Sequence, residues 1–195
     1  MQVNVYAINA INNMLGAAFQ AGGGSNGGPG DLLGRKLAAE ANKNCGQILQ
    51  TYLQEQGLGW NTVAASIHYF NAVGTDADMK LGDLPGYQGS WGPANESLLN
   101  FVQNVQNDPQ VGGPIGAAVL GNNVVLASGY YYVTSHGLTV TDQAGKQFIL
   151  FHEFWHVATG LNDIDMVHQF VDPNFSGTTG DASTRLNTWL SNDCY

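Results

Sequence analysis

The stretch "QFILFHEFWHVATG", residues 147–160, sets the main expectation for the fold of this chain. Its apolar side chains recur at intervals of three and four, the spacing of one buried face of an α-helix. The residues on this face are Phe148, Phe151, Trp155 and Ala158. Asp142 can cap the start of the helix, and Gly160 can take the left-handed conformation that ends it. The sequence therefore predicts a buried helix near the centre of the molecule.

The same helix carries two histidines and a glutamate in the pattern H-E-x-x-H. Residues four apart lie one above the other on a helix, so His152 and His156 present their imidazoles to the same point. Two neutral imidazoles can bind Zn²⁺, and Glu153 then lies beside the metal's water as a general base. Burying three ionisable groups in an apolar helix without a metal or partners would be costly. We therefore predict a catalytic zinc site and not three unrelated core residues.

The chain after this motif restricts the third metal ligand. No glutamate follows Glu153, which excludes the class of zinc proteases that uses a downstream glutamate. A third histidine at the usual spacing is also absent, because Asn162 stands at its position. The candidates that remain are Asp163, Asp165 and His168.

Asp163 is the preferred third ligand. It follows Gly160 by three residues, so the chain can reverse at the glycine and point the carboxylate back at the metal. Its alternative role is the N-cap of the short turn that follows, for which aspartate is also suited. Asp165 is the next candidate, and His168 needs a longer return loop.

Outside the central helix, further helices alternate with short strands. The predicted elements are a helix that begins at Asp31 and stops near Gly57, a strand at 62–70, a long loop at 71–93, a helix at 94–106, a hairpin that turns at 121–123 and a short final helix capped by Asp181. This order predicts an α+β fold in which a mostly antiparallel, twisted sheet packs on the central helix. A Gly-rich run at 21–30 reads as a linker or loop. We therefore expect an N-terminal segment at 1–30 and a single domain at 31–195.

The composition excludes two classes of partner. The formal net charge is −9 with only six Lys and Arg, too few cations to meet the phosphates of a nucleic acid. No basic amphipathic helix or long apolar run is present, so a membrane partner is not expected. The two cysteines, Cys45 and Cys194, are either unrelated buried thiols or one long-range disulfide of a secreted protein.

Two segments carry a resemblance to a known family. "HEFWHVATGLNDID" and the late "STRLNTWLSNDC" resemble the zincin-type metallopeptidases of secreted or Rhs-associated proteins of acidobacteria, and the downstream aspartate is similar to that of aspzincins. The resemblance covers roughly the last 45 residues, and upstream only "NKNCGQIL" adds to it. It implies a zincin-like fold, Zn²⁺ as cofactor, hydrolysis of peptide bonds in a protein or peptide substrate, and secretion to the periplasm or outside the cell. It also favours a Cys45–Cys194 disulfide.

The resemblance further implies a substrate-binding edge strand and a side chain that stabilises the oxyanion. The best candidate for the strand is "VVLASGYYYV", residues 124–133. The candidates for the oxyanion donor are Tyr130, Tyr131, Tyr132, His136 and Tyr195. His68 is interpreted as a sheet histidine and not as a ligand.

Together these features predict a zinc-dependent endopeptidase with His152, His156 and Asp163 as ligands and Glu153 as general base. The alternatives are a metal-dependent amidase or toxin domain, and a zinc-binding structural module without turnover. Glu153 argues against the structural module, because a purely structural zinc site is usually closed by four protein ligands.

Overall fold

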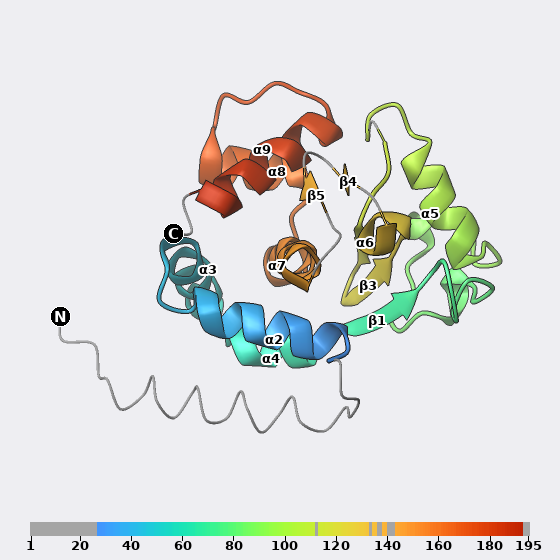
Figure 1. Cartoon of the computed structure of the whole chain (residues 1–195), viewed down its shortest axis with the longest axis horizontal. Coiled ribbons are helices and arrows are strands. Elements are labelled where there is room, and N and C mark those ends of the chain that lie inside the picture. The colour runs from blue at the N-terminus through green and yellow to red at the C-terminus, as the bar shows by residue number, and fades with distance from the viewer. Residues whose placement is uncertain (1–26, 112, 133, 136–137, 140–142, 193–195) are drawn as a thin grey trace.

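A computed structural model describes residues 27–111, 113–132, 134–135, 138–139 and 143–192. The predicted central helix is confirmed as α7 (Gln143–Thr159), which Figure 1 shows almost end-on in the middle of the molecule. Its side chains Phe151, Phe154 and Trp155 are fully buried. The predicted cap Asp142 lies outside the described residues, whereas Gly160 ends the helix at a φ of 70°, as expected.

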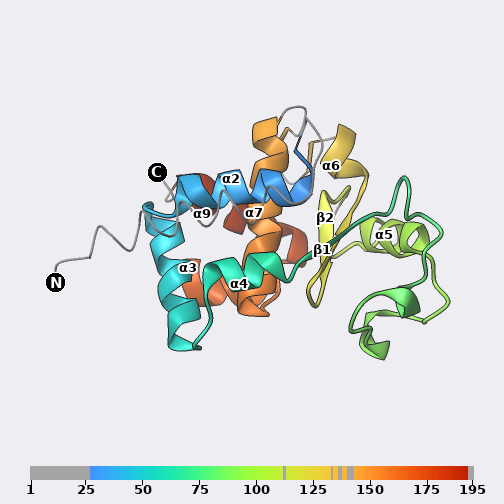
Figure 2. The same cartoon turned by 90° about the horizontal axis from the view of Figure 1, so that it is seen from below.

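Three helices cover one side of α7, as Figures 1 and 2 show. They are α2 (Pro29–Glu40), α3 (Asn44–Glu55) and α4 (Trp60–Ala65). The prediction of one long helix from Asp31 was wrong, because the chain turns between α2 and α3. Lys43 in this turn reaches back to the buried carboxylate of Glu40, at 3.2 Å. The carbonyl of Glu40 also lies so close to Gly46 that a side chain at Gly46 would collide with it.

The start of α2 also differs from the prediction. The N-cap is Gly28, and Pro29 occupies the first helical position, where its fixed φ suits a helix and its missing N–H costs nothing. Asp31 lies inside the first turn, where a negative charge is favourable to the helix dipole. Regular structure therefore extends into the end of the predicted linker. Residues 1–26 lie outside the described residues, and the division into a segment at 1–30 and a domain at 31–195 stays a prediction.

The predicted strand at 62–70 is helical in its first half. Trp60, Val63 and Ala64 are buried at helical spacing, and the Trp60 ring packs edge-on against Phe154 of α7, with 5.8 Å between ring centroids. Packing against α7 thus outweighs the strand propensity of this stretch. The strand itself is β1 (His68–Asn71).

The sheet has three strands in the order β1, β3, β2 and lies beside α7. The predicted hairpin is confirmed: β2 (Ala117–Leu120) and β3 (Asn123–Leu126) pair antiparallel across a turn whose Gly121 has a φ of 61°. β1 pairs parallel with the other edge of β3, so this sheet is mixed and not mostly antiparallel.

The prediction that residues 124–133 form a substrate-binding edge strand was also wrong. β3 is the central strand, with both edges already paired, and the chain then forms the short helix α6 (Ser128–Tyr132). A two-stranded ribbon of β4 (Thr134–Ser135) and β5 (Leu138–Thr139) follows.

The segment between β1 and β2 forms a second small core. It contains the 3₁₀ turns η2 (Leu81–Asp83) and η3 (Gly89–Trp91) and the helix α5 (Leu98–Gln106). The helix predicted at 94–106 is thus confirmed from residue 98 onward, because Ser97 accepts a hydrogen bond from the amide of Asn100 and caps it. Leu98 and Val102 are buried, and Phe101 and Val105 are partly buried.

The C-terminal part packs on the side of α7 that carries the histidines. It consists of α8 (Asp163–Met166), the π-helical turn η4 (Val167–Val171) and α9 (Thr179–Asn192). Asp181 is not the cap residue itself. It forms a reciprocal pair with Thr178, since each side chain accepts from the other residue's amide, at 3.2 and 3.0 Å. This is a capping box with aspartate in the third helical position.

No helix among the described residues is long and apolar enough to cross a membrane. Cys45 is fully buried in the first turn of α3. Its predicted partner, Cys194, lies outside the described residues, and the disulfide between them stays a prediction. Overall, the α+β class is confirmed.

Candidate metal centre

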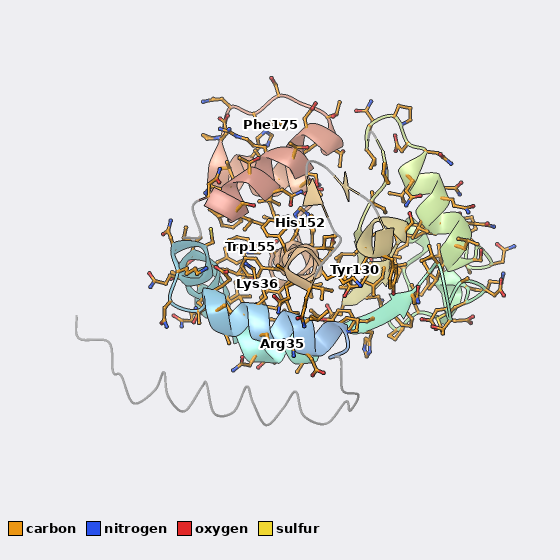
Figure 3. The ribbon with its side chains drawn as sticks, viewed as in Figure 1. Arg35, Lys36, Tyr130, His152, Trp155 and Phe175 are labelled. Carbon is orange, nitrogen blue, oxygen red and sulfur yellow. The ribbon has the colours of Figure 1, made fainter. Side chains whose placement is uncertain are left out.

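The histidines of α7 meet as the H-E-x-x-H spacing predicts. The Nε2 atoms of His152 and His156 lie 3.0 Å apart. Figure 3 shows His152 on the side of α7 that faces α9. Both side chains are largely buried, with 8% and 13% of their surface exposed. The helix therefore holds two imidazole nitrogens close together in a place of low water access.

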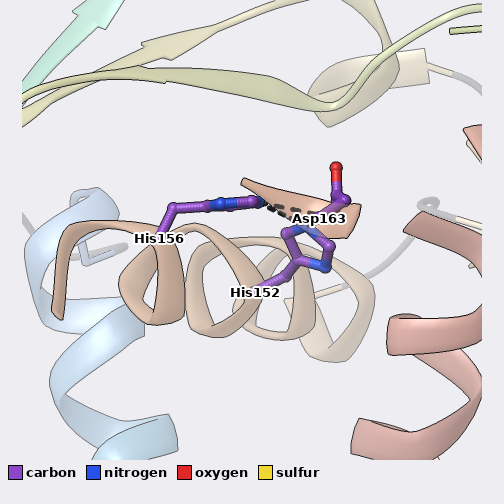
Figure 4. A group of neighbouring side chains, drawn as sticks. All are labelled: His152, His156 and Asp163. Atoms are coloured by element: carbon purple, nitrogen blue, oxygen red, sulfur yellow. Dashed lines mark hydrogen bonds and ion pairs between the residues drawn. The ribbon is translucent and has the colours of Figure 1, made fainter. Parts of the chain in front are cut away.

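Asp163 brings a carboxylate oxygen to the same point (Figure 4). Its Oδ1 atom lies 3.2 Å from Nε2 of His152 and 3.5 Å from Nε2 of His156. In a tetrahedral zinc site with bonds of about 2.0–2.1 Å, ligand atoms are about 3.3 Å from one another. The three separations observed, 3.0, 3.2 and 3.5 Å, surround that value. The group thus fits a zinc ion in size and in the chemistry of its donor atoms.

The turn between α7 and α8 positions this carboxylate. The amide of Gly160 donates to the carbonyl of His156 at 2.8 Å, which closes the last turn of α7. The positive φ of Gly160 then reverses the chain, so Asp163 begins α8 facing the histidines. The predicted geometry of a reversal followed by a returning aspartate is therefore present.

The outer nitrogen of each imidazole is hydrogen-bonded away from the group. Nδ1 of His156 lies 2.7 Å from the carbonyl oxygen of Leu161, and Nδ1 of His152 lies 2.8 Å from Oδ1 of Asn187. A carbonyl oxygen can only accept, so the hydrogen of His156 is on Nδ1. In the neutral imidazole, the lone pair of Nε2 then points at the shared centre. Such outer hydrogen bonds are typical of histidines that bind metals.

The electrostatics of the group attract a cation. Burial lowers the pKa of His152, but the hydrogen bond and negative charge of Asp163 outweigh burial and raise this pKa to about 9. Burial raises the pKa of Asp163, but the two imidazoles outweigh it and hold this pKa well below its ordinary value. The aspartate is therefore ionised, and the centre favours either a proton or a metal ion between its ligand atoms.

The two alternative ligands lie elsewhere. Asp165 is exposed and accepts a hydrogen bond from the side chain of Asn162 at 2.8 Å. His168 is exposed and has its Nε2 atom 2.9 Å from the carbonyl oxygen of Phe175. The N-cap of α8 is Asn162, whose side chain accepts from the amide of Asp165. The capping role considered for Asp163 thus belongs to its neighbour.

A cavity of about 520 Å³ opens beside the three residues. α7 forms one wall, the strand β2 a second and the first half of α9 a third. Glu153 is buried and lines the cavity together with His152 and His156. The predicted general base therefore faces the same space as the predicted ligands. Most of the remaining wall is apolar, and the residues that form it include Ile115, Ala117, Val119, Ile149 and Val157.

Two of the predicted oxyanion donors, Tyr130 and Tyr131, have described side chains. Neither of these side chains lines the cavity, and both rings lie under the ammonium of Lys146, at 5.4 and 5.5 Å. Tyr130 is a buried residue of α6 (Figure 3), and burial raises its pKa to about 12. The side chain of Tyr132 and the residues His136 and Tyr195 lie outside the described part. His68 is an exposed residue of β1, as expected of a sheet histidine.

Sequence reasoning missed the contribution of α9. Asn187 follows His152 by 35 residues, and no local pattern links the two. A weak signal was present, because Ser183 and Asn187 stand four apart on the helix face that also holds Ala182, Leu186 and Leu190. Polar residues on an apolar helix face call for a partner.

Compared with known proteins, the chain matches no family, no curated sequence and no solved structure.

Proposed function

We propose that this protein is a zinc-dependent endopeptidase. The observation that carries the proposal is the group of His152, His156 and Asp163, whose donor atoms have the separations of a tetrahedral zinc site. The Nδ1 atom of each imidazole is hydrogen-bonded to a residue outside this group, as is typical of histidines that bind metals. These three residues would hold the zinc ion. Among the described residues no fourth ligand joins them, which fits a catalytic site with an open position better than a closed structural site.

The metal supplies two effects when bound: it polarises a carbonyl group and lowers the pKa of a water molecule. Glu153 is next to His152 in the chain and faces the same cavity, so its carboxylate takes the proton of the attacking water. It then delivers this proton to the amide nitrogen that leaves. Asn187 and the Leu161 carbonyl keep the two imidazoles oriented during these steps.

The strand β2 supports a polypeptide as substrate. One edge of β2 pairs with β3, and no strand among the described residues pairs with its other edge. Ala117, Ala118 and Val119 of β2 line the cavity. An extended peptide can therefore add to this edge and pass the centre with its backbone hydrogen-bonded. The small and apolar wall favours uncharged side chains next to the bond that is cleaved. This role belongs to β2 in place of residues 124–133.

Metal analysis combined with a protease assay tests the proposal. We expect about one zinc per chain and cleavage of casein or gelatin that a chelator stops and added zinc restores. Glu153→Gln should keep its zinc and lose hydrolysis, because Glu153 acts on water and does not hold the metal. Loss of zinc together with activity would make Glu153 a ligand or a structural partner.

Two other outcomes distinguish the alternative functions. Zinc binding without hydrolysis of any protein, but with cleavage of small cell-wall amides, would indicate a metal-dependent amidase or toxin domain. Tight zinc binding and no turnover, with a Glu153→Gln variant that matches the wild type in every respect, would indicate a structural module. Secretion is part of the proposal and follows from the proposed disulfide, which forms in oxidising compartments.

A further inference from the structure

Ser183 differs from the other hydroxyl residues in the body of α9. Thr184, Thr188 and Ser191 each donate a hydrogen bond to the carbonyl oxygen four residues earlier, at 3.0, 2.8 and 2.7 Å. This is a common way for a helix to satisfy a Ser or Thr hydroxyl. Within the part of the chain that the structure describes, the Ser183 hydroxyl has no hydrogen-bond partner, although the residue is only 9% exposed. The Ser183 oxygen is not among the fully buried atoms that lack a partner, so it is accessible from the cavity and its O–H is free to donate to a bound molecule.

The Ser183 side chain lines the cavity beside the proposed metal centre. It stands one helical turn before Asn187, which lies 2.8 Å from His152, and residues four apart share a helix face. The other polar side chains of the cavity wall have partners or are more exposed. Asn162 caps α8, and the side chain of Asn122 donates to the Ser66 hydroxyl. Thr179, the other hydroxyl of this wall, is only partly buried.

The reaction proposed above needs a donor of this kind. When water adds to the peptide carbonyl, negative charge develops on the carbonyl oxygen, and a positioned donor in a water-poor site stabilises it. Among the side chains that the structure describes, neither Tyr130 nor Tyr131, two of the tyrosines predicted for this role, lines the cavity. We propose that Ser183 is a further catalytic residue, whose hydroxyl donates a hydrogen bond to the carbonyl oxygen of the scissile peptide bond. This rests on the proposed function.

The proton and electron movements are as follows. The water oxygen bonds to the carbonyl carbon, and the π electrons of the carbonyl move to its oxygen. Glu153 takes one proton from the water and gives it to the amide nitrogen. The electron pair on the oxygen then re-forms the C=O bond, and the C–N bond breaks with its electron pair leaving on the nitrogen, which gives a carboxylic acid and an amine. Ser183 keeps its own proton throughout and only shares it in a hydrogen bond. It forms no covalent bond to the substrate.

The variant Ser183→Ala tests this role, with zinc-loaded full-length protein and a fluorogenic peptide built around a casein cleavage site. We expect kcat to fall about 10- to 100-fold with KM changed less than about threefold, because the hydrogen bond strengthens as charge develops. The zinc content and Tm should match those of the wild type. Ser191→Ala is the matched control on the same helix, since its hydroxyl is bonded to the Asn187 carbonyl and does not line the cavity. It should keep the wild-type kcat.

A binding measurement gives a readout without turnover. A phosphinic peptide of the same sequence carries a tetrahedral, negatively charged centre in place of the scissile bond. Its affinity for Ser183→Ala should fall at least about tenfold by calorimetry, while Ser191→Ala binds it as the wild type does. An unchanged kcat and unchanged phosphinate affinity in Ser183→Ala would overturn the role of Ser183 and leave the peptidase function standing. A wild-type protein that binds zinc but neither cleaves peptides nor binds the phosphinate would overturn both.

Discussion

His156 donates its Nδ1 hydrogen to the carbonyl of Leu161, and this one hydrogen bond decides which nitrogen faces the proposed metal. Leu161 follows the glycine that ends α7, so the same turn orients the imidazole of His156 and returns Asp163 to it. At the residue scale the site is therefore built largely from a short piece of chain. His152 is the exception, because its outer partner, Asn187, comes from α9.

Asp163→Ala should lower zinc affinity by more than about 100-fold, since the loss of a ligand exceeds the 10- to 100-fold typical of outer partners. The Oδ1 atom of Asp163 is the only carboxylate oxygen that the described residues bring to the two Nε2 atoms. The measurement is a competition titration with a zinc-binding dye.

Asp165→Ala and His168→Ala are the matched controls, and both should bind zinc as the wild type does. The Asp165 side chain is hydrogen-bonded to Asn162, and the His168 side chain is hydrogen-bonded to the Phe175 carbonyl. If Asp165→Ala loses zinc and Asp163→Ala keeps it, the ligand assignment is wrong.

The pKa shifts predict how the stability of the zinc-stripped protein depends on pH. The pKa of His152 is raised from 6.5 to about 9, so its stabilising effect is complete below about 6.5 and is lost as the pH rises through about 9. The pKa of Asp163 is lowered, so its contribution is present above its ordinary value near 4 and is lost in more acidic solution. In the presence of a chelator, the free energy of unfolding should therefore fall between pH 6.5 and 9.

Urea denaturation at several pH values measures this dependence. Asp163→Asn is the control, since the neutral amide no longer raises the pKa of His152 and the slope between pH 6.5 and 9 should flatten. Equal slopes in both proteins would contradict the proposed pairing of His152 with Asp163.

At the scale of elements, the junction between α7 and α8 depends on the conformation of Gly160. Its φ is 70°, and a Cβ atom placed there would meet no other atom within 4 Å. A substitution is therefore opposed by the backbone conformation alone and not by packing. The same conformation sends the chain from the end of α7 to the N-cap Asn162 and to Asp163.

Gly160→Ala should reduce the free energy of unfolding by about 1 kcal/mol, the cost of a left-handed conformation for a residue with a Cβ atom. Gly160→Asn should cost less, because asparagine tolerates this region better. Chemical denaturation measures both. Gly89→Ala is the control, since its Cβ also meets open space and its φ is not in the left-handed range. A Gly160→Ala variant as stable as Gly89→Ala would show that α7 can end without a left-handed residue.

At the scale of the whole molecule, the site depends on how the C-terminal helix is held. α9 contributes Asn187 to the metal centre and Ser183 to the cavity wall. Its first turn is joined to the loop after α5, where the amide of Gly180 donates to the carbonyl of Gln110 at 2.9 Å. At Gly180 a side chain would collide with the Val111 carbonyl, so this contact is tight.

The predicted Cys45–Cys194 disulfide would fix the chain just after α9 to the start of α3. It closes a loop of about 150 residues. By lowering the entropy of the unfolded chain, a disulfide across such a loop stabilises the folded state by roughly 4–5 kcal/mol. Mass spectrometry of unreduced peptides from protein made under oxidising conditions should recover the two cysteines in one linked species. Two thiols that react freely with an alkylating agent would refute the pairing.

The sequence alone determined the features that depend on near neighbours in the chain. A spacing of four on a helix brings His152 and His156 together, and a glycine followed by an aspartate returns a carboxylate to the same place. The hairpin turn at Gly121 is also local, since turn chemistry acts over a few residues. These predictions needed no knowledge of the rest of the fold.

Only the tertiary structure decided what depends on contacts between distant segments. The strand order placed β3 in the centre, because β1 pairs with it in parallel, and it left the edge beside the cavity to β2. Packing against Phe154 made residues 60–65 helical in spite of their composition. Asn187 reached His152 across 35 residues. Strand pairing, core packing and side-chain partners of this kind join residues far apart in the chain, and so no local pattern encodes them.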